Sequence, residues 1–359
     1  MIIFSPGPAN ISERVRQALT LPDIGHREEE MSQLLGDVKT LLADALKINN
    51  RDYEIVVFSG SGTLAIEALI TCLAGWEKTL FIISNGIYGE RARDIALTYG
   101  VKVKELKLDW GKPPDLATVE EEISRDDIGG VYLIHHETTT GLINPLEEIA
   151  RIARKYGKLV LGDTISSLAG EHIDFNWGLD GVVGTANKCF RGVPGVSFAI
   201  LSRNFLDVAR KRERRTYYSD LLTHMERETI KNETPFTPPV HTLFAFREAL
   251  RETLDEGVEN RIAHYRDISG LLRDGLKDAG LRLYLDDALY SNTMTSVYLP
   301  SGVTYQELHD EIKKRGFVIY NSQGQLRGTV FMLGVVGLID SQDIREFLAV
   351  LKEVLGVST

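Results

Sequence analysis

The sequence has few of the features that mark secreted or membrane-spanning proteins. Only two of its 359 residues are cysteines, Cys72 and Cys189, and both lie in apolar surroundings. That usage is typical of a reducing compartment and not of a small domain held together by disulfides. No apolar run approaches the roughly 18 residues that a membrane-spanning helix needs, and the first residues lack the basic-then-apolar pattern of a leader. We therefore expect a cytoplasmic protein that makes no membrane contact.

Positive charge and metal-ligand spacings are also scarce. The net charge is -10, whereas a protein that binds nucleic acid needs a basic face for the phosphate backbone. Neither Cys-x-x-Cys nor His-x-x-x-His occurs, so we expect no metal site. The adjacent His135 and His136 have no third ligand in the pattern, and we expect them to be structural. The expected partners are small molecules.

What is present is a regular alternation of strands and helices. From residue 53 onward, apolar β-branched runs alternate with helical patterns and glycine-rich turns. The predicted strands are residues 53–58, 79–84, 101–106, 130–135, 158–162, 181–186 and 196–201, and the predicted helices are 63–73, 91–99, 116–124 and 145–156. This alternation predicts an α/β fold with a mostly parallel sheet covered on both faces. Ligands of such sheets gather beyond the carboxyl ends of the strands.

The pattern changes at the proline-rich stretch PFTPPVHT, residues 235–242. A long amphipathic helix follows and is interrupted near Gly257. The last hundred residues predict an α+β module with strands at 281–285, 294–299, 317–320 and 330–335, and helices at 305–315 and 341–355. We therefore expect an N-terminal arm (1–11), a large domain (12–240), and a connecting helix with a small C-terminal domain (241–359).

One lysine stands out for its setting. Lys188 follows a buried strand and precedes Gly192, Pro194 and Gly195. A lysine that is desolvated at such a place becomes a usable nucleophile, although its spacing alone also fits an ordinary surface cation. The strand at 158–162 ends in Asp163, and pyridoxal-phosphate enzymes need an acid of this kind against the ring nitrogen. The aspartate also fits the cap of a following helix.

A phosphate site is indicated by the glycine-rich turn at residues 59–62. The turn joins a strand to a helix and so presents free backbone N–H groups at the positive end of that helix. The stretch SGSGTLAI lacks the third glycine of the dinucleotide-binding pattern. Together with Lys188 and Asp163, the turn places polar groups at several strand ends that would converge in a parallel sheet.

Several motifs in one order carry a resemblance to a known family. The chain resembles the class-V aminotransferases, which are fold-type I pyridoxal-phosphate enzymes, and among them the 2-aminoethylphosphonate:pyruvate aminotransferases. The motifs are SPGPANIS, GSGTLAIEA, SNGIYGER, HHETTTGLINPLEEI, DTISSLAGEHID, TANKCFRGVPGVSF, FTPPVHTLFAF and GFVIYNSQGQ. The resemblance implies a large domain with a seven-stranded, mostly parallel sheet and a smaller C-terminal α+β domain. It also implies ping-pong transfer of an amino group from a small donor such as 2-aminoethylphosphonate to pyruvate or a similar oxo acid.

The resemblance also assigns roles to residues. Lys188 would be the internal aldimine lysine and the proton shuttle, and Asp163 would keep the pyridine nitrogen protonated. The cofactor contacts would come from Ser61, Gly62 and Thr63 at the phosphate, Tyr88 on the ring face, Thr139 near the ring hydroxyl, and Thr237 reaching the phosphate from the neighbouring subunit. Taken alone, Tyr88 is equally a packing aromatic. A site completed by a second chain implies a homodimer with shared active sites.

One position departs from the family pattern. Where relatives have an arginine in a Phe-Arg-Ile-Gly strand that binds the substrate anion, this chain has Met332. A methionine has no charge and no paired donors. We expect Arg27 or Arg191 to replace that arginine, with Gly7 also near the substrate, and Arg327 as a weaker candidate. The alternative is a pyridoxal-phosphate lyase or β/γ-replacement enzyme on the same fold.

Overall fold

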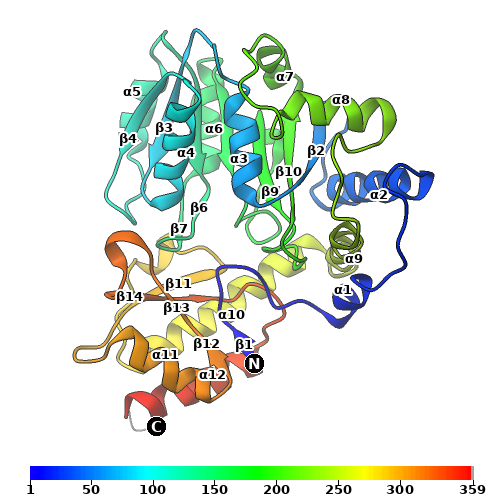
Figure 1. The fold of residues 1–359 in the computed structure, drawn as a ribbon. Coiled ribbons are helices and arrows are strands. Elements are labelled where there is room, and N and C mark those ends of the chain that lie inside the picture. Colours follow the sequence, from blue (N-terminus) through cyan, green and yellow to red (C-terminus); the bar gives the residue numbers. More distant parts are fainter. Residues whose placement is uncertain (357–359) are drawn as a thin grey trace.

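A seven-stranded sheet forms the centre of the larger of two bodies in the computed structural model, which describes residues 1–356 (Figure 1). The strand order is β2-β10-β9-β8-β5-β3-β4, and only β10 runs antiparallel to its neighbours. The strands are β2 (Tyr53–Ser59), β3 (Thr79–Ser84), β4 (Val103–Lys107), β5 (Ile128–Ile134), β8 (Leu159–Asp163), β9 (Gly181–Thr185) and β10 (Val196–Ser202). The predicted mostly parallel α/β sheet is confirmed.

Both faces of this sheet are buried under helices. Successive side chains of a strand point to opposite faces, so Ile55 and Val57 of β2 join one apolar core while Val56 and Phe58 join the other. One face is covered by α3 (Gly62–Thr71), α4 (Ile87–Thr98), α7 (Arg203–Ala209) and α8 (Leu221–Lys231), and the other by α2 (Glu29–Ala45), α5 (Leu116–Ile123), α6 (Leu146–Lys155) and α9 (Val240–Glu256). Apart from the edge strand β4, which contains three charged residues, the strands are accordingly almost continuous apolar runs.

The smaller body lies below the sheet in Figure 1 and is built from the C-terminal part of the chain. An antiparallel sheet of order β11-β14-β13 packs with three helices. The elements are β11 (Met294–Tyr298), β13 (Tyr320–Asn321), β14 (Val330–Gly334), α10 (Val258–Asp278), α11 (Tyr305–Lys314) and α12 (Ser341–Leu355). Gly257, at φ 81°, separates α9 from α10, which confirms the predicted interruption, because a left-handed residue ends a helix.

Short elements complete the chain. They are β1 (Ile2–Ile3), α1 (Glu13–Ala18), β6 (His136–Glu137), β7 (Leu142–Ile143), β12 (Phe317–Val318), and the 3-10 turns η1 (Phe175–Trp177), η2 (Asp287–Leu289) and η3 (Gly324–Leu326). None of the helices among residues 1–356 combines the length and the apolar character needed to cross a bilayer.

Two strand predictions in the smaller body are wrong. Residues 281–285 form no strand and make a single bridge, from Leu283 to Val297. Residues 317–320 were expected as one strand, but Phe317 pairs with Ile2 in one sheet and Tyr320 pairs with Met332 in another. The chain passes from one sheet to the next between them, and an apolar run alone does not reveal such a crossing.

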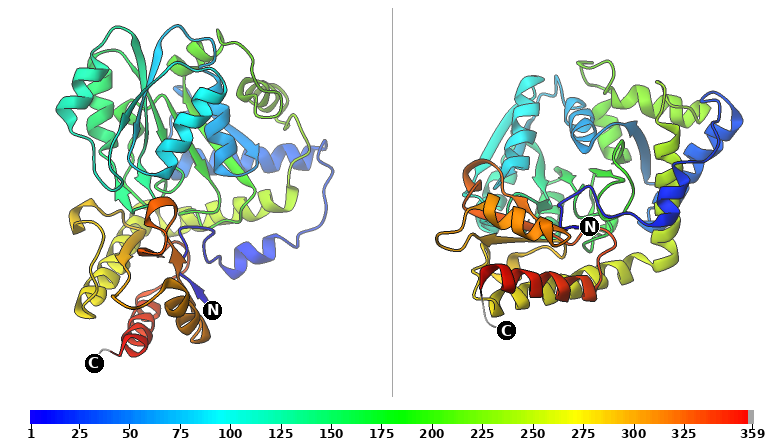
Figure 2. Two further views of the ribbon diagram at one scale, coloured as in Figure 1. Left: turned by 60° about the vertical axis from the view of Figure 1, so that its left-hand side comes forward. Right: turned by 60° about the horizontal axis from the view of Figure 1, so that its bottom comes forward.

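The N-terminal arm runs between the two bodies (Figure 2). Strand β1 pairs in parallel with β12, and Asn10 bridges to Gly337. Gly334 donates its amide to Phe4 O at 3.1 Å, and a Cβ at Gly334 would lie 2.2 Å from Ser5 O. Helix α9, which we assigned to the second domain, packs against α1 and α2. The domain limits at residues 11 and 240 stay a prediction.

Candidate active site

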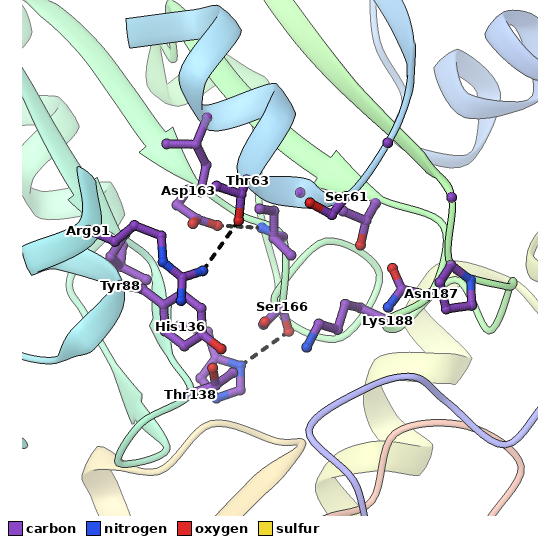
Figure 3. Close-up of a pocket in the computed structure, with 18 residues that line it drawn as sticks. Ser61, Thr63, Tyr88, Arg91, His136, Thr138, Asp163, Ser166, Asn187 and Lys188 are labelled. Atoms are coloured by element: carbon purple, nitrogen blue, oxygen red, sulfur yellow. Dashed lines mark hydrogen bonds between the residues drawn. The ribbon is translucent and has the colours of Figure 1, made fainter. Parts of the chain in front are cut away.

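A cavity of about 430 Å³ opens at the carboxyl ends of the central strands, where a parallel sheet is expected to bind its ligand. Six of the predicted site residues line it, namely Ser61, Gly62, Thr63, Tyr88, Asp163 and Lys188. Six further polar residues line it that we do not assign to the site from the sequence, namely Arg91, His136, Thr138, Ser166, Thr185 and Asn187. Figure 3 shows Lys188 entering from one side of this cavity and Tyr88 and Arg91 from the other.

The Lys188 amine is held by the N-terminal arm. Its Nζ donates to Pro6 O at 2.5 Å, and desolvation lowers the lysine pKa to about 8, although the charges of Cys189 and Asp163 oppose the shift. Gly7 packs directly on the lysine, because a Cβ there would lie 2.6 Å from Lys188 Cδ. Gly7 therefore contacts the lysine side chain and is absent from the cavity lining. An amine with this pKa is partly neutral at physiological pH.

Asp163 is the last residue of β8 and is only 4% exposed. Its Oδ1 accepts the amide of Ile165 at 2.9 Å, and no donor among residues 1–356 reaches the other oxygen. Burial raises the pKa of this carboxyl to about 6, against the Ile165 hydrogen bond and the charges of Lys188 and Arg91. The carboxylate is thus ionised at neutral pH and can hold a cationic ring nitrogen.

The floor of the cavity is the start of α3. Ser61 is the N-cap but its side chain caps nothing, and the amides of Gly62 and Thr63 have no acceptor among residues 1–356. A Cβ at Gly62 would lie 2.5 Å from Ile165 Cδ1, so glycine lets the start of α3 approach this side chain closely. Thr185 Oγ1, buried in the cavity wall, also lacks a hydrogen bond. Unpaired donors at a helix N-terminus fit a phosphate.

These groups fit pyridoxal phosphate. The helix end offers amides for the phosphate, Asp163 offers a carboxylate for the ring nitrogen, and Lys188 offers an amine for the aldehyde. Each of these three groups has a free donor, acceptor or lone pair on the cavity side. The donor set of the described residues therefore suits this cofactor.

The hairpin β6–β7 places threonines beside the cavity, but not in the expected way. Thr138 lines the cavity, whereas Thr139 does not. The hydroxyl of Thr139 meets Glu137 Oε1 at 2.5 Å and accepts the amide of Ile87 at 3.1 Å. Thr138 is thus the threonine of this motif that lines the cavity, and the assignment of Thr139 to the cofactor ring stays a prediction.

Glu137 holds the hairpin and α4 together. Its buried carboxylate accepts the amides of Thr139 at 3.1 Å, Tyr88 at 3.2 Å and Gly89 at 3.3 Å. Burial raises the pKa of this carboxyl to about 7, and the hydrogen bonds of Thr139 and Gly89 oppose the shift. Sequence reasoning missed Glu137, whose only signal was an acid between strand and turn in HHETTTG.

His136 joins the two bodies. Its Nδ1 donates to Ser166 O at 3.1 Å, and its Nε2 accepts from Ser291 Oγ at 2.8 Å. Burial lowers the His136 pKa to about 4, so the ring is neutral and both nitrogens are engaged. No group of three His, Cys, Asp or Glu side chains within residues 1–356 is arranged to bind a metal.

Besides Gly7 and Thr139, four more predicted residues lie outside the cavity lining. Arg191, only 5% exposed, donates to Tyr265 Oη at 2.9 Å and to Glu256 at 3.0 Å, and its binding of substrate stays a prediction. Arg27 donates to Thr234 O at 2.7 Å and does not reach the cavity of its own chain. Met332 is buried in β14 opposite Ser296. Thr237 is exposed.

Comparisons with known proteins identify the family of this chain. The profile described as "Aminotransferase class-V" matches residues 10–329. A 2-aminoethylphosphonate–pyruvate transaminase of Bacillus cytotoxicus is 33% identical over 98% of this chain and 97% of its own. A transaminase of the same name from Syntrophobacter fumaroxidans is 34% identical, over 99% and 96%.

Solved structures show the same fold. The subgroup IV aspartate aminotransferase of Thermus thermophilus superposes with a TM-score of 0.89 at 29% identity, covering 99% of both chains. The alanine–glyoxylate aminotransferase of Nostoc sp. gives a TM-score of 0.92 at 26% identity, over 99% of this chain and 95% of that one. The chain belongs to the class-V aminotransferase family and is a pyridoxal-phosphate-dependent aminotransferase of fold type I.

Proposed function

We propose that this enzyme moves an amino group from a small acidic donor, of the kind that 2-aminoethylphosphonate represents, to pyruvate or a similar oxo acid. The observation that carries the proposal is the meeting of Lys188, Asp163 and the open start of α3 in one cavity. The names of the relatives support the choice of donor and acceptor. Met332 leaves the contact that would bind the donor's acid group to another residue.

In this proposal each cavity residue has one task. The amides of Gly62 and Thr63, with Ser61, hold the cofactor phosphate, and Tyr88 packs against the ring. Asp163 keeps the ring nitrogen cationic, and Thr138 takes the place near the ring hydroxyl that we had expected for Thr139.

When bound, pyridoxal phosphate supplies an electron sink for the carbon that carries the amino group. Lys188 Nζ moves the proton at that carbon, because the lysine pKa of about 8 makes the neutral amine available as a base near neutral pH. The carbonyl of Pro6 accepts from Nζ and so orients the amine.

We further propose a homodimer. Thr237 is the one exposed residue of the proline-rich segment 235–242 and is absent from the lining of its own cavity, whereas a second chain would bring it to the phosphate. Tyr217, which is 75% exposed, has its ring 5.9 Å from Phe236 of this segment. Exposed aromatics of this kind are enriched at protein interfaces. Cytoplasmic localisation stays a prediction from the sequence.

The alternative of a lyase or replacement enzyme gains no support from the described residues. A desulfurase needs a cysteine on a mobile loop, whereas Cys72 and Cys189 are 1% and 0% exposed. Burial raises the pKa of each thiol to about 12, which makes both poor nucleophiles.

Borohydride reduction of the cofactor-loaded enzyme tests the proposal. We expect a peptide map to show the cofactor fixed to Lys188. Addition of 2-aminoethylphosphonate should bleach the visible absorption, and pyruvate should restore it. Release of ammonia without an oxo acid acceptor would contradict transamination. Labelling at another lysine would contradict the assignment of the site.

A further inference from the structure

The cavity contains a cation for which the proposed cofactor contacts have no use. Among the residues that line it, Lys188 and Arg91 are the only ones with a positive charge, since His136 is neutral. Lys188 is reserved for the cofactor. Arg91 is therefore the cation that remains for a second anion, and the position of the family's own anion-binding arginine is held by the apolar Met332.

Arg91 is placed by α4, one turn after Tyr88. Residues three apart lie on the same face of a helix, so the guanidinium covers the Tyr88 ring with its carbon 4.7 Å from the centroid. One nitrogen, Nη1, donates to Thr63 Oγ1 at 3.3 Å. Figure 3 shows the remainder of the guanidinium turned toward the cavity, opposite Lys188.

The charge of Arg91 has no counterion among the described residues. No carboxylate among residues 1–356 lies within 4.0 Å of its nitrogens, whereas Arg191 pairs with Glu256 and Arg27 with Glu233. A half-buried guanidinium with free donors is suited to the paired oxygens of a carboxylate, phosphate or phosphonate. Both earlier candidates thus have a carboxylate partner, whereas Arg91 has none among residues 1–356.

We propose that Arg91 binds the acid group of the substrate and so selects acidic amino donors and oxo acids. The inference rests on the proposed function for the reaction in which those substrates take part. Two oxyanions enter this cavity, the cofactor phosphate and the substrate acid. The start of α3 provides amides for the phosphate, and Arg91 provides the charge for the acid.

The test compares Arg91→Gln and Arg91→Lys with the unaltered enzyme. The control is Arg93→Gln on the same helix, because Arg93 pairs with Asp94 and Glu105 outside the cavity. The probe is ethylphosphonate, which has the acid group but no amine and cannot react. Calorimetry on the cofactor-loaded enzymes measures its binding, and equilibrium dialysis measures the affinity for pyridoxal phosphate.

We expect Arg91→Gln to weaken ethylphosphonate binding by ~10- to 100-fold, which corresponds to losing hydrogen bonds to a charged group. The KM for 2-aminoethylphosphonate should rise alongside, with little change in cofactor affinity. Arg91→Lys should recover part of the ethylphosphonate affinity and part of the KM. Arg93→Gln should have the same ethylphosphonate affinity and KM as the unaltered enzyme.

Equal binding of ethylphosphonate by the unaltered enzyme and Arg91→Gln would overturn the inference. A variant that loses affinity for pyridoxal phosphate alone would also overturn it, because that result would place Arg91 at the cofactor phosphate. The same holds if the unaltered enzyme binds no ethylphosphonate. Failure of the proposed function looks different. In that case ethylphosphonate binding still depends on Arg91, but no acidic amine bleaches the enzyme.

Discussion

At the scale of single residues, the reactivity of Lys188 is set by its burial. A lysine that titrates near pH 8 instead of 10.5 loses its charge at a pH where a surface lysine keeps it. Since the neutral amine is the form that attacks an aldehyde, the shift decides when the enzyme can take up its cofactor.

We predict that the rate of cofactor uptake by the cofactor-free enzyme falls about tenfold per pH unit below about pH 8 and levels off above it. The sign follows from the lowered pKa, because the amine becomes increasingly protonated as the pH falls below that value. Stopped-flow absorbance across a pH series measures the rate. A midpoint near 10.5 would show that the amine is solvated, and Lys188→Ala should take up no cofactor covalently.

The sequence predicted those site residues that sit at strand ends. Asp163 and Lys188 follow buried strands, and the ends of parallel strands converge whatever the details of packing. Arg91 was within reach of the same reasoning, because it lies one helical turn after Tyr88. Which of Thr138 and Thr139 lines the cavity depends on the twist of the β6–β7 hairpin. The sequence does not reveal this, because it shows only adjacent threonines. The contacts of Arg191 with Tyr265 and Glu256 could not be read from the sequence, because both partners are distant along the chain.

At the scale of elements, Glu137 decides where helix α4 begins. One carboxylate accepts two amides at the start of α4 and one in the β6–β7 turn. Tyr88 and the threonine turn are therefore fixed by the same side chain, and the two cavity walls share one anchor.

Replacement of Glu137 by alanine should destabilise the enzyme by about 1–3 kcal/mol, because it leaves buried donors without acceptors. Cofactor retention should fall as well, since Tyr88 loses its support. Glu137→Gln keeps one acceptor oxygen, so its stability should lie between that of the unaltered enzyme and that of Glu137→Ala. Thermal unfolding with and without pyridoxal phosphate measures both effects. The control is the exposed Glu121→Ala, and equal melting of Glu137→Ala and this control would refute the anchoring role.

Element prediction succeeded where packing was simple. The central strands are buried on both faces, so their apolar runs were unambiguous, and Gly257 marked the break between α9 and α10. In the smaller body the strands are two to five residues long, and one of them, β12, has its partner β1 at the opposite end of the chain. The pairing of β1 with β12 was not foreseen for that reason.

At the scale of the whole molecule, the proposed dimer gives the proline-rich segment 235–242 a role. Tyr217→Asp introduces a charge into the aromatic cluster beside Phe236 and should shift the protein toward monomers in sedimentation equilibrium. Thr237→Ala removes one hydroxyl and should leave the dimer intact while weakening cofactor binding.

The control for the dimer is Leu338→Ser, which replaces an exposed leucine of the smaller body. A monomeric unaltered enzyme with full activity would exclude shared active sites. If Thr237→Ala has unchanged cofactor affinity, Thr237 does not bind the phosphate. The dimer itself is tested separately by the sedimentation of Tyr217→Asp.

The hydrogen bond between Lys188 Nζ and Pro6 O has a consequence for biosynthesis. The segment that meets the amine leaves the ribosome well before the strands that hold it, β12 and β14, which are translated more than 300 residues later. A nascent chain thus carries Lys188 without its cap until β12 and β14 have been made. Capture of the vitamin B6 aldehyde in its final geometry therefore follows the synthesis of these two strands.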